Sequence, residues 1–335
     1  MSICEAEQVA GGPYFDDVEV GHVFDRAPTM TLTTGAAALH QAILGDRLRL
    51  ALDATLAAAV TGSSAPLAHP ALVSDIAIGQ STLATQRVKA NLFYRGLAFH
   101  RFVEVGDTLG TRTEVVGMKQ NALRDGRAPT GLVALRVTTT DQRGRLVLDF
   151  HRCAMLPLSP GTTATDHRDD LTSIGAGGTA TDPTRDWDAD AFRSRVPGPH
   201  FAPELQGCRY RSTGDVVSSA PELARLSLNI AATHHDHRSD KERLVYGGHT
   251  IGIALAQVTR LLPNLATILN WASCDHTGPV REGDTLYSDL EVERVSTLPG
   301  GRGGILHLRS LVYAVGVGGE GDRQVLDWRF AALMF

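Results

Sequence analysis

The sequence predicts an α+β protein that contains two copies of one fold, each a long buried helix wrapped by an antiparallel β-sheet. Residues 106–115 (GDTLGTRTEV) and 283–292 (GDTLYSDLEV) are identical at six of ten positions and start 177 residues apart. VLDF at 147–150 recurs as VLDW at 325–328, 178 residues later. Chance matches would not share a register, and this period is too long for a solenoid repeat. The chain therefore reads as a duplicated domain.

The first copy is expected to start with two helical segments. Residues 31–46 follow a polar cap, and residues 71–87 are apolar almost all round, as in a buried helix. Strand-like runs follow at 107–118, 130–140 and 144–156. A long helix covered by an antiparallel sheet fits this order, because the helix and one sheet face then bury each other.

The second copy repeats that order. Helical segments are expected at 220–238 and 249–263, and strands at 284–295, 304–315 and 323–335. The matching order of elements supports the duplication independently of the identical residues.

The segment between the copies is rich in Gly, Ser, Thr, Pro and Asp. This composition predicts a linker that fills no core, with one short helix near residues 186–195. We therefore divide the chain into an N-terminal repeat (1–158), a polar linker (159–201) and a C-terminal repeat (202–335).

Composition and charge exclude several classes of protein. The formal net charge is −5 and no run of Lys and Arg is present, so nucleic acid is not an expected partner. No apolar stretch approaches the roughly 20 residues of a membrane span, and the acidic first residues lack the features of a signal peptide. The four cysteines (Cys4, Cys153, Cys208 and Cys274) have no metal or redox spacing. We expect a cytoplasmic protein with reduced, mostly buried thiols.

Residues 316–321 (GVGGEG) match the glycine pattern of dinucleotide-binding loops. That mechanism needs a strand before the loop and a helix after it. Here a second strand-like run follows, so a hairpin loop is expected instead.

The polar residues cluster in the second copy. SLNIAATHHDHR holds Asn229, His234 and Asp236, and LVYGGHTIG places Gly247 and Gly248 where the buried helix starts. A helix start offers free backbone N–H groups and the positive end of a dipole. Two glycines let a ligand oxygen approach that backbone, as in an oxyanion hole, although they also permit tight packing alone.

At these residues the chain resembles the MaoC-like, or R-specific, enoyl-CoA hydratases in their two-repeat, double hot-dog form. The signature of that family is D-x-N-P-[IL]-H-x-D, with a histidine–glycine pair about a dozen residues later. PVREGDTL (279–286) is similar to the family's entry into its later strands. Residues 90–109 are similar to the mesaconyl-CoA and β-methylmalyl-CoA hydratase branch.

The resemblance implies roles for seven residues of the second copy. His234 takes the position of the motif's histidine and Asp236 that of its trailing aspartate, while Asn229 replaces the catalytic aspartate. Gly248, or Gly247 in a shifted alignment, would polarise the thioester carbonyl, and the flanking Tyr246 and His249 would help to bind substrate. The implied catalytic set is His234, Asn229 and Asp236; the implied oxyanion and substrate-binding set is Gly248, Gly247, Tyr246 and His249.

The implied reaction is the addition of water to a 2-enoyl-CoA, or its elimination from a 3-hydroxyacyl-CoA. His234 can act as the base, because imidazole titrates near neutral pH. Asn229 can only orient the water, because an amide exchanges no proton. The missing carboxylate leaves three possibilities: Asp236 or a nearby histidine supplies the second group, a substrate carboxylate assists, or the chain is not a hydratase.

The first copy has lost the motif. Asp46 keeps the aspartate position, but Leu48, Arg49 and Ala51 replace its Asn, Pro and His. Only the second copy is expected to carry chemistry, and Asp46 reads as a helix-end residue. His40 is expected to be an ordinary core or surface histidine.

Other functions stay open. The spacing of the histidines at 234–237 does not suit a metal site, and CoA is needed only as part of the substrate, so no metal or separate cofactor is expected. A thioesterase and a non-catalytic acyl-CoA-binding protein remain alternatives. The acyl-CoA partner is expected to enter between the repeats, and a homodimer is compatible with the sequence.

Overall fold

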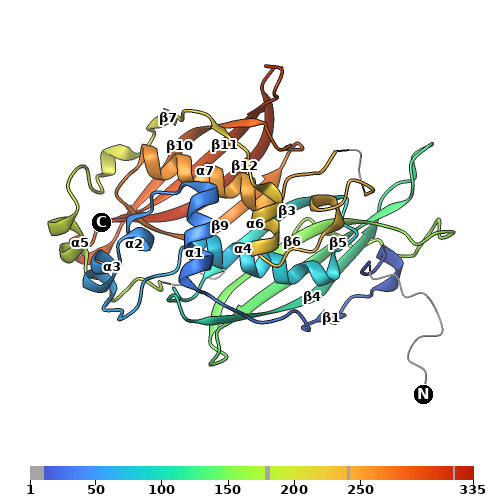
Figure 1. Cartoon of the computed structure of the whole chain (residues 1–335), viewed down its shortest axis with the longest axis horizontal. Coiled ribbons are helices and arrows are strands. Elements are labelled where there is room, and N and C mark those ends of the chain that lie inside the picture. Colours follow the sequence, from blue (N-terminus) through green and yellow to red (C-terminus); the bar gives the residue numbers. More distant parts are fainter. Residues whose placement is uncertain (1–10, 178–181, 240–241, 320) are drawn as a thin grey trace.

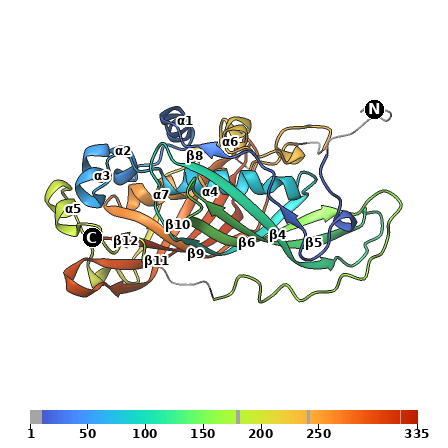
Figure 2. The ribbon, with the colours of Figure 1, turned by 90° about the horizontal axis from the view of Figure 1, so that it is seen from below.

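The computed structural model describes residues 11–177, 182–239, 242–319 and 321–335. Its strands form one 12-stranded antiparallel sheet whose main path is β1-β4-β5-β6-β3-β9-β12-β11-β10-β7. Most helices gather on one face of this curved sheet, and residues 159–177 of the connection between the repeats run along the other face (Figures 1 and 2). The α+β architecture of two similar halves, predicted from the repeated motifs, is therefore confirmed.

The two repeats have matching elements. Those of the first are η1 (Phe15–Asp17), β1 (Val23–Phe24), β2 (Met30–Thr31), α1 (Thr34–Leu44), α2 (Arg49–Leu52), α3 (Ala54–Thr61), α4 (Pro70–Gln80), η2 (Ser81–Ala84), β3 (Ala90–Phe99), β4 (Thr108–Gln120), β5 (Thr130–Thr140) and β6 (Leu146–Pro157). After α5 (Ala189–Arg195) and η3 (Pro203–Leu205), those of the second are β7 (Arg209–Arg211), β8 (Asp215–Val216), α6 (Ala220–Leu226), η4 (Ala232–His234), α7 (Gly247–Leu261), β9 (Leu265–His276), β10 (Thr285–Thr297), η5 (Pro299–Gly301), β11 (Gly304–Val315) and β12 (Arg323–Met334).

Local chemistry explains where the helices begin and end. The Thr33 hydroxyl accepts a hydrogen bond from the Ala36 N–H and caps α1, and Gly45 ends it in the left-handed region (φ 66°). Every residue of α4 is buried, as its apolar sequence predicts. The second long helix, α7, is buried over most of its length. Both predicted central helices are thus confirmed.

Sequence patterns missed the two strands that join the repeats. β3 and β9 pair antiparallel, with Tyr94 opposite Cys274 and Leu97 opposite Trp271. The first half of β9 is buried on both faces, so it lacks the alternation of a half-buried strand. Their pairing merges the two half-sheets into one.

The linker contains the predicted short helix, α5, but the expectation that it fills no core is wrong. Trp187, Phe192 and Val196 are buried in a cluster with residues of α3 and the C-terminal end of β12. A few large apolar residues within a polar segment are enough to anchor it.

Three smaller predictions can be checked. Among the described residues, Cys153, Cys208 and Cys274 are free thiols and Cys208 alone is partly exposed, whereas Cys4 lies outside them. The glycine-rich loop connects β11 to β12, which pair antiparallel, so it is a hairpin loop; residue 320 lies outside the described residues. No helix in the described ranges has both the length and the hydropathy to cross a membrane.

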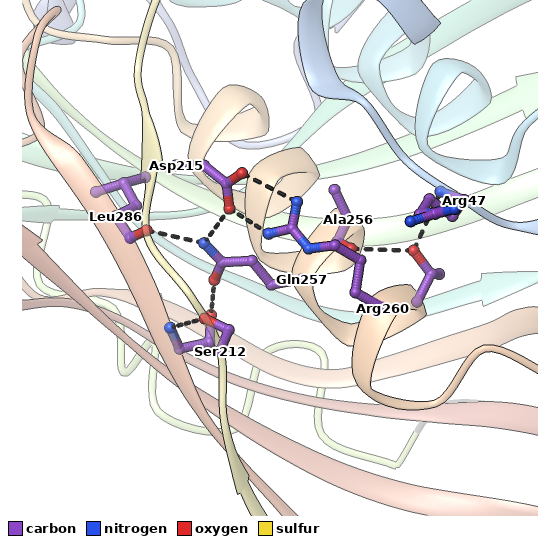
Figure 3. A network of polar contacts seen from close by, with 9 residues as sticks. Arg47, Ser212, Asp215, Ala256, Gln257, Arg260 and Leu286 are labelled. Atoms are coloured by element: carbon purple, nitrogen blue, oxygen red, sulfur yellow. Dashed lines mark hydrogen bonds and ion pairs between the residues drawn. The ribbon is translucent and has the colours of Figure 1, made fainter.

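A buried glutamine fixes each central helix to its sheet. In the second repeat, Gln257 Nε2 donates to the Leu286 carbonyl and to Asp215 (both 2.8 Å), and its Oε1 accepts from the Ser288 hydroxyl (2.5 Å) (Figure 3). Arg260, one turn further along α7, also donates to Asp215. The helix that opens at Gly247 is therefore held at its far end.

The first repeat contains the same connection 177 positions earlier in the sequence. Gln80 Nε2 donates to the Leu109 carbonyl (3.1 Å), and its Oε1 accepts from the Thr111 hydroxyl (2.6 Å). The duplication has thus preserved a buried hydrogen-bond network as well as the strands.

Replacing Gln257 by leucine should lower the free energy of unfolding by about 2–4 kcal/mol, because each buried polar group left without a partner costs about 1–3 kcal/mol. Gln80→Leu makes the matching change in the first repeat and should cost a similar amount. Urea unfolding of both variants would measure this, and a loss under about 1 kcal/mol in both would contradict a structural role for the network.

Candidate active site

A cavity of about 330 Å³ lies between the repeats. The first repeat contributes residues of η2, β3 and β6, and the second contributes the 229–246 segment, the start of α7 and the end of β9. Six lining residues matter most for its chemistry: Tyr94, Arg152, Asn229, His234, Gly247 and His276. The expectation that a ligand enters between the repeats agrees with this position.

His234 is held in one orientation at the wall of the cavity. Its Nδ1 lies 2.8 Å from the Leu244 carbonyl oxygen, which can only accept, so Nδ1 must carry the hydrogen. In neutral imidazole Nε2 is then a free acceptor. Burial lowers the pKa of His234 to about 4, with smaller contributions from His235 and Arg152. The ring is therefore neutral at pH 7.

The first repeat holds the segment that carries Asn229. A Cβ atom added at Gly79 would lie 1.7 Å from the Ser227 carbonyl oxygen, so α4 contacts this segment backbone to backbone. The Ile230 N–H donates to the Thr82 hydroxyl (3.0 Å). Asn229 is buried, and its Oδ1 accepts from the Ala231 N–H (3.0 Å), which leaves the Nδ2 hydrogens as the donors still available.

The start of α7 provides backbone donors. Neither Gly247 nor Gly248 donates its N–H to an acceptor within the described part of the chain. Gly247 lines the cavity, whereas a Cβ atom added at Gly248 would lie 2.2 Å from Asp75 Oδ1 and 2.4 Å from the Tyr246 ring. The structure thus brings Gly247, and not Gly248, to the cavity wall.

Tyr246 lines the cavity with part of its ring and is anchored by the first repeat. Its hydroxyl donates to Asp75 Oδ1 (3.0 Å), and Asp75 Oδ2 lies 3.1 Å from His40 Nε2. All three side chains are buried. His40 is a core histidine with a partner, as expected, and with Asp75 it fixes the residue that caps α7.

Besides Gly248, two further predicted site residues do not line the cavity. Asp236 pairs with the exposed Arg238 at 2.7 Å, which lowers the pKa of its carboxyl to about 2, and it does not line the cavity. His249 is buried inside α7, away from the cavity lining, and its Nδ1 has no hydrogen-bond partner among the described residues. Sequence spacing placed both near the motif but could not show where they point.

Of the six lining residues named above, Tyr94, Arg152 and His276 were missed by sequence reasoning, and the last two carry polar groups that bear on the chemistry. Arg152 on β6 is 3% exposed and donates only to neutral groups: Asn91 (3.1 Å), Ser81 (2.7 Å) and Thr85 (3.1 Å). No carboxylate of the described residues pairs with it. His276 ends β9, and burial together with Arg152 and His234 lowers its pKa to about 4.

The position that corresponds to the cavity by the repeat symmetry is filled by side chains. Tyr94 pairs with Arg152 across β3 and β6, and Trp271 pairs with Phe330 across β9 and β12. The corresponding space at the start of α4 is a remnant of about 10 Å³, lined among others by Pro70 and Phe99 of the first repeat and by Trp271 and Trp328 of the second. Comparing the two copies position by position is the signal that could have found Arg152 and His276.

The first repeat also lacks the helix-start donors. Pro70, which stands where Gly247 stands in the second, has no N–H, and the Ala71 N–H donates to His69 Nδ1 (3.1 Å). Asp46 caps a turn through the Leu48 N–H (2.7 Å) and lies 3.0 Å from His69 Nε2. No cluster of histidine, cysteine and carboxylate side chains suited to a metal occurs in the described ranges.

Comparisons with known proteins identify this fold and its family. A solved structure of a conserved hypothetical protein from Mycobacterium tuberculosis, described as essential for bacterial survival during infection and as having a double hotdog fold, is 65% identical. It covers 97% of this chain and 99% of its own, with a TM-score of 0.94. A protein from Chloroflexus aurantiacus described as a MaoC-domain dehydratase is 25% identical over 98% and 99% of the two chains, with a TM-score of 0.78.

Curated relatives point the same way, although no family model matches the sequence. β-Methylmalyl-CoA dehydratase of Chloroflexus aurantiacus is 27% identical over 96% of this chain and 97% of its own. Mesaconyl-CoA hydratase of Cereibacter sphaeroides is 25% identical over 84% and 83% of the two chains. The chain belongs to the MaoC-like family in its double hot-dog form, and its named relatives are hydratases and dehydratases.

The three buried histidines make stability depend on pH. His234, His249 and His276 each have a pKa of about 4 in the folded chain, because burial disfavours the imidazolium, against about 6.5 when unfolded. Between these values the unfolded chain binds more protons, so the free energy of unfolding falls as pH falls. We expect a loss of about 1.4 kcal/mol per pH unit for each histidine that gains a proton on unfolding.

Urea unfolding at pH 7 and pH 5 would measure this slope. His249→Leu, which introduces the residue found at the equivalent position 72, should reduce the slope by about one proton without touching the cavity lining. An equal slope in the variant and the wild type would contradict the assignment for His249.

Proposed function

We propose that this chain is an acyl-CoA hydratase or dehydratase, which adds water to a 2-enoyl-CoA or removes it from a 3-hydroxyacyl-CoA. The observation that carries the proposal is one geometry: a neutral His234 fixed through Nδ1, opposite a helix start whose Gly247 N–H is free. A base and an oxyanion donor that share one cavity between the repeats are what the reaction needs.

In the hydration direction, His234 Nε2 accepts a proton from a water molecule. The water oxygen bonds to C3 of the enoyl group, and the C2–C3 π electrons move toward the thioester to form an enolate. The Gly247 N–H stabilises the enolate oxygen. C2 then takes the proton from the imidazolium, which restores neutral His234. One base can thus serve both steps, because the proton that it removes is the proton that it returns.

Asn229 orients the water in this scheme. Its Nδ2 can donate to the water oxygen while the water donates to His234, because its Oδ1 is already engaged by the Ala231 N–H. The asparagine therefore needs to exchange no proton. This role keeps Asn229 in the site and leaves Asp236, which pairs with Arg238, outside it.

Arg152 favours an acyl group that carries its own carboxylate. A buried guanidinium that donates only to neutral groups retains unmatched positive charge, which is costly unless an anion arrives with the ligand. The two curated relatives are named for mesaconyl-CoA and β-methylmalyl-CoA. We propose a short dicarboxylic acyl-CoA as the substrate of this chain.

Replacing His234 by alanine should lower kcat for enoyl-CoA hydration by about 10²–10⁴, because the base is lost. Loss of the conjugated thioester's ultraviolet absorbance would measure the rate with crotonyl-, longer trans-2-enoyl- and mesaconyl-CoA. His237→Ala is the matched control, since His237 is exposed on the same segment and does not line the cavity.

The same assay separates the alternatives. Free CoA, detected with a thiol reagent, would indicate a thioesterase. Binding of all three CoA esters without turnover would indicate a binding protein. Equal rates in His234→Ala and the wild type would contradict the proposed base.

Replacing Arg152 by glutamine should lower kcat/KM for mesaconyl-CoA by roughly 10- to 100-fold, the worth of a hydrogen bond to a charged group. The value for crotonyl-CoA should change much less. Lys89→Gln removes an exposed positive charge from the cavity lining and serves as the control. A parallel fall for both substrates in Arg152→Gln would show that the arginine only supports the fold.

A further inference from the structure

His276 lines the cavity and lies against the helix start. A Cβ atom added at Gly247 would lie 2.7 Å from His276 Nε2, so the imidazole edge and the first residue of α7 are in contact. Nε2 is shut off from solvent and has no hydrogen-bond partner among the described residues. A buried polar nitrogen without a partner costs stability, so its presence here calls for an explanation.

The first repeat places a phenylalanine at the corresponding position. Phe99 pairs with Leu148 across β3 and β6, and His276 pairs with Leu326 across β9 and β12. Phe99 lines the closed remnant of the first repeat, whereas His276 lines the open cavity of the second. An apolar ring is therefore enough to fill this position, so packing alone does not explain why the second repeat has an imidazole there.

The surroundings keep His276 neutral. Arg152 and His234 are the charged or titratable groups that lower its pKa, after burial itself, and the Tyr94 ring packs edge-on at 5.9 Å. No carboxylate raises the pKa of its ring. A neutral imidazole carries one N–H, which it can donate to a developing negative charge without first losing or gaining a proton.

We propose that His276 is a catalytic residue that donates a hydrogen bond to the thioester oxygen and, with the Gly247 N–H, stabilises the enolate. The inference rests on the proposed function. When hydroxide adds to C3, the π electrons move to C1–C2 and the carbonyl π pair moves to oxygen; the His276 proton stays on its nitrogen. When C2 then takes the proton from the His234 imidazolium, the C1–C2 π pair forms the C–H bond and the oxygen pair re-forms the carbonyl. His276 therefore polarises, and His234 transfers the proton.

Two variants test the assignment. His276→Phe introduces the residue of the first repeat and removes the donor, while His276→Gln keeps an N–H. We expect kcat to fall by about 10²–10³ in His276→Phe, the usual cost of one oxyanion donor, and clearly less in His276→Gln. KM should stay within a few-fold in both. Urea midpoints would confirm that both variants fold.

A second measurement reads the polarisation directly and needs no turnover. Cinnamoyl-CoA, whose aryl group is conjugated to the thioester, should absorb at longer wavelength when bound, because a polarised carbonyl draws electron density from the ring. The shift should persist in His234→Ala and become clearly smaller in His276→Phe, where only the Gly247 N–H still polarises the carbonyl. A wild type that shows the shift without hydrating any substrate would contradict the proposed function and the catalytic role of His276, and would leave only the hydrogen bond from His276 to the thioester oxygen.

Three results would overturn the inference: kcat of His276→Phe within about three-fold of wild type, an unchanged absorption shift in His276→Phe, or no shift in the wild type on binding. If His276→Phe failed to fold, His276→Gln would decide, since full loss of both rate and shift in a variant that keeps an N–H would also contradict a donor role.

Discussion

The pairing of β3 with β9 is the contact on which the rest of the structure depends. It joins the two half-sheets edge to edge over Phe93–Ala98 and Asn270–Asp275, and it brings α4 beside α7. Because of this junction, residues of the first repeat line the cavity of the second. Arg152 and Tyr94 reach the site across it, and Thr82 and Gly79 hold the segment that carries Asn229.

The two copies have used one position in opposite ways. At the start of α4, Phe99 of the first repeat and Trp271 and Trp328 of the second fill the space between helix and sheet, and Pro70 removes the helix-start donor. In the second, glycine, imidazole and guanidinium leave a polar cavity. Filling the space buries large aromatic rings and stabilises the fold, whereas leaving the cavity open loses part of that stabilisation and keeps room for a ligand. A duplicated chain can hold both solutions, since one half can support the other.

Much of this arrangement could be predicted from the sequence, and the reason for each failure is physical. The repeated GDTL and VLD motifs located β4, β6, β10 and β12, and apolar runs located α4 and α7, because these signals are local. β3 and β9 escaped because burial on both faces removes alternation. His234 and the helix start at Gly247 came from the motif alone.

The remaining site residues depend on contacts far apart in the chain. Arg152 and Asn229 are 77 positions apart in sequence, and only the sheet brings them to one cavity. Asp236 is kept out of the cavity by a local contact instead: its partner Arg238 is only two residues away, and the ion pair faces solvent. Comparing the copies with each other would have drawn attention to Arg152 against Phe330, and to His276 against Phe99.

The buried contact between Tyr246 and Asp75 has a consequence for the history of the chain. Asp75 stands in the repeat that lost its motif, yet it fixes the residue that caps the working helix of the other. Because of this dependence, separating the two repeats at the linker would not give two independently complete domains. The fusion of the two copies is therefore hard to reverse.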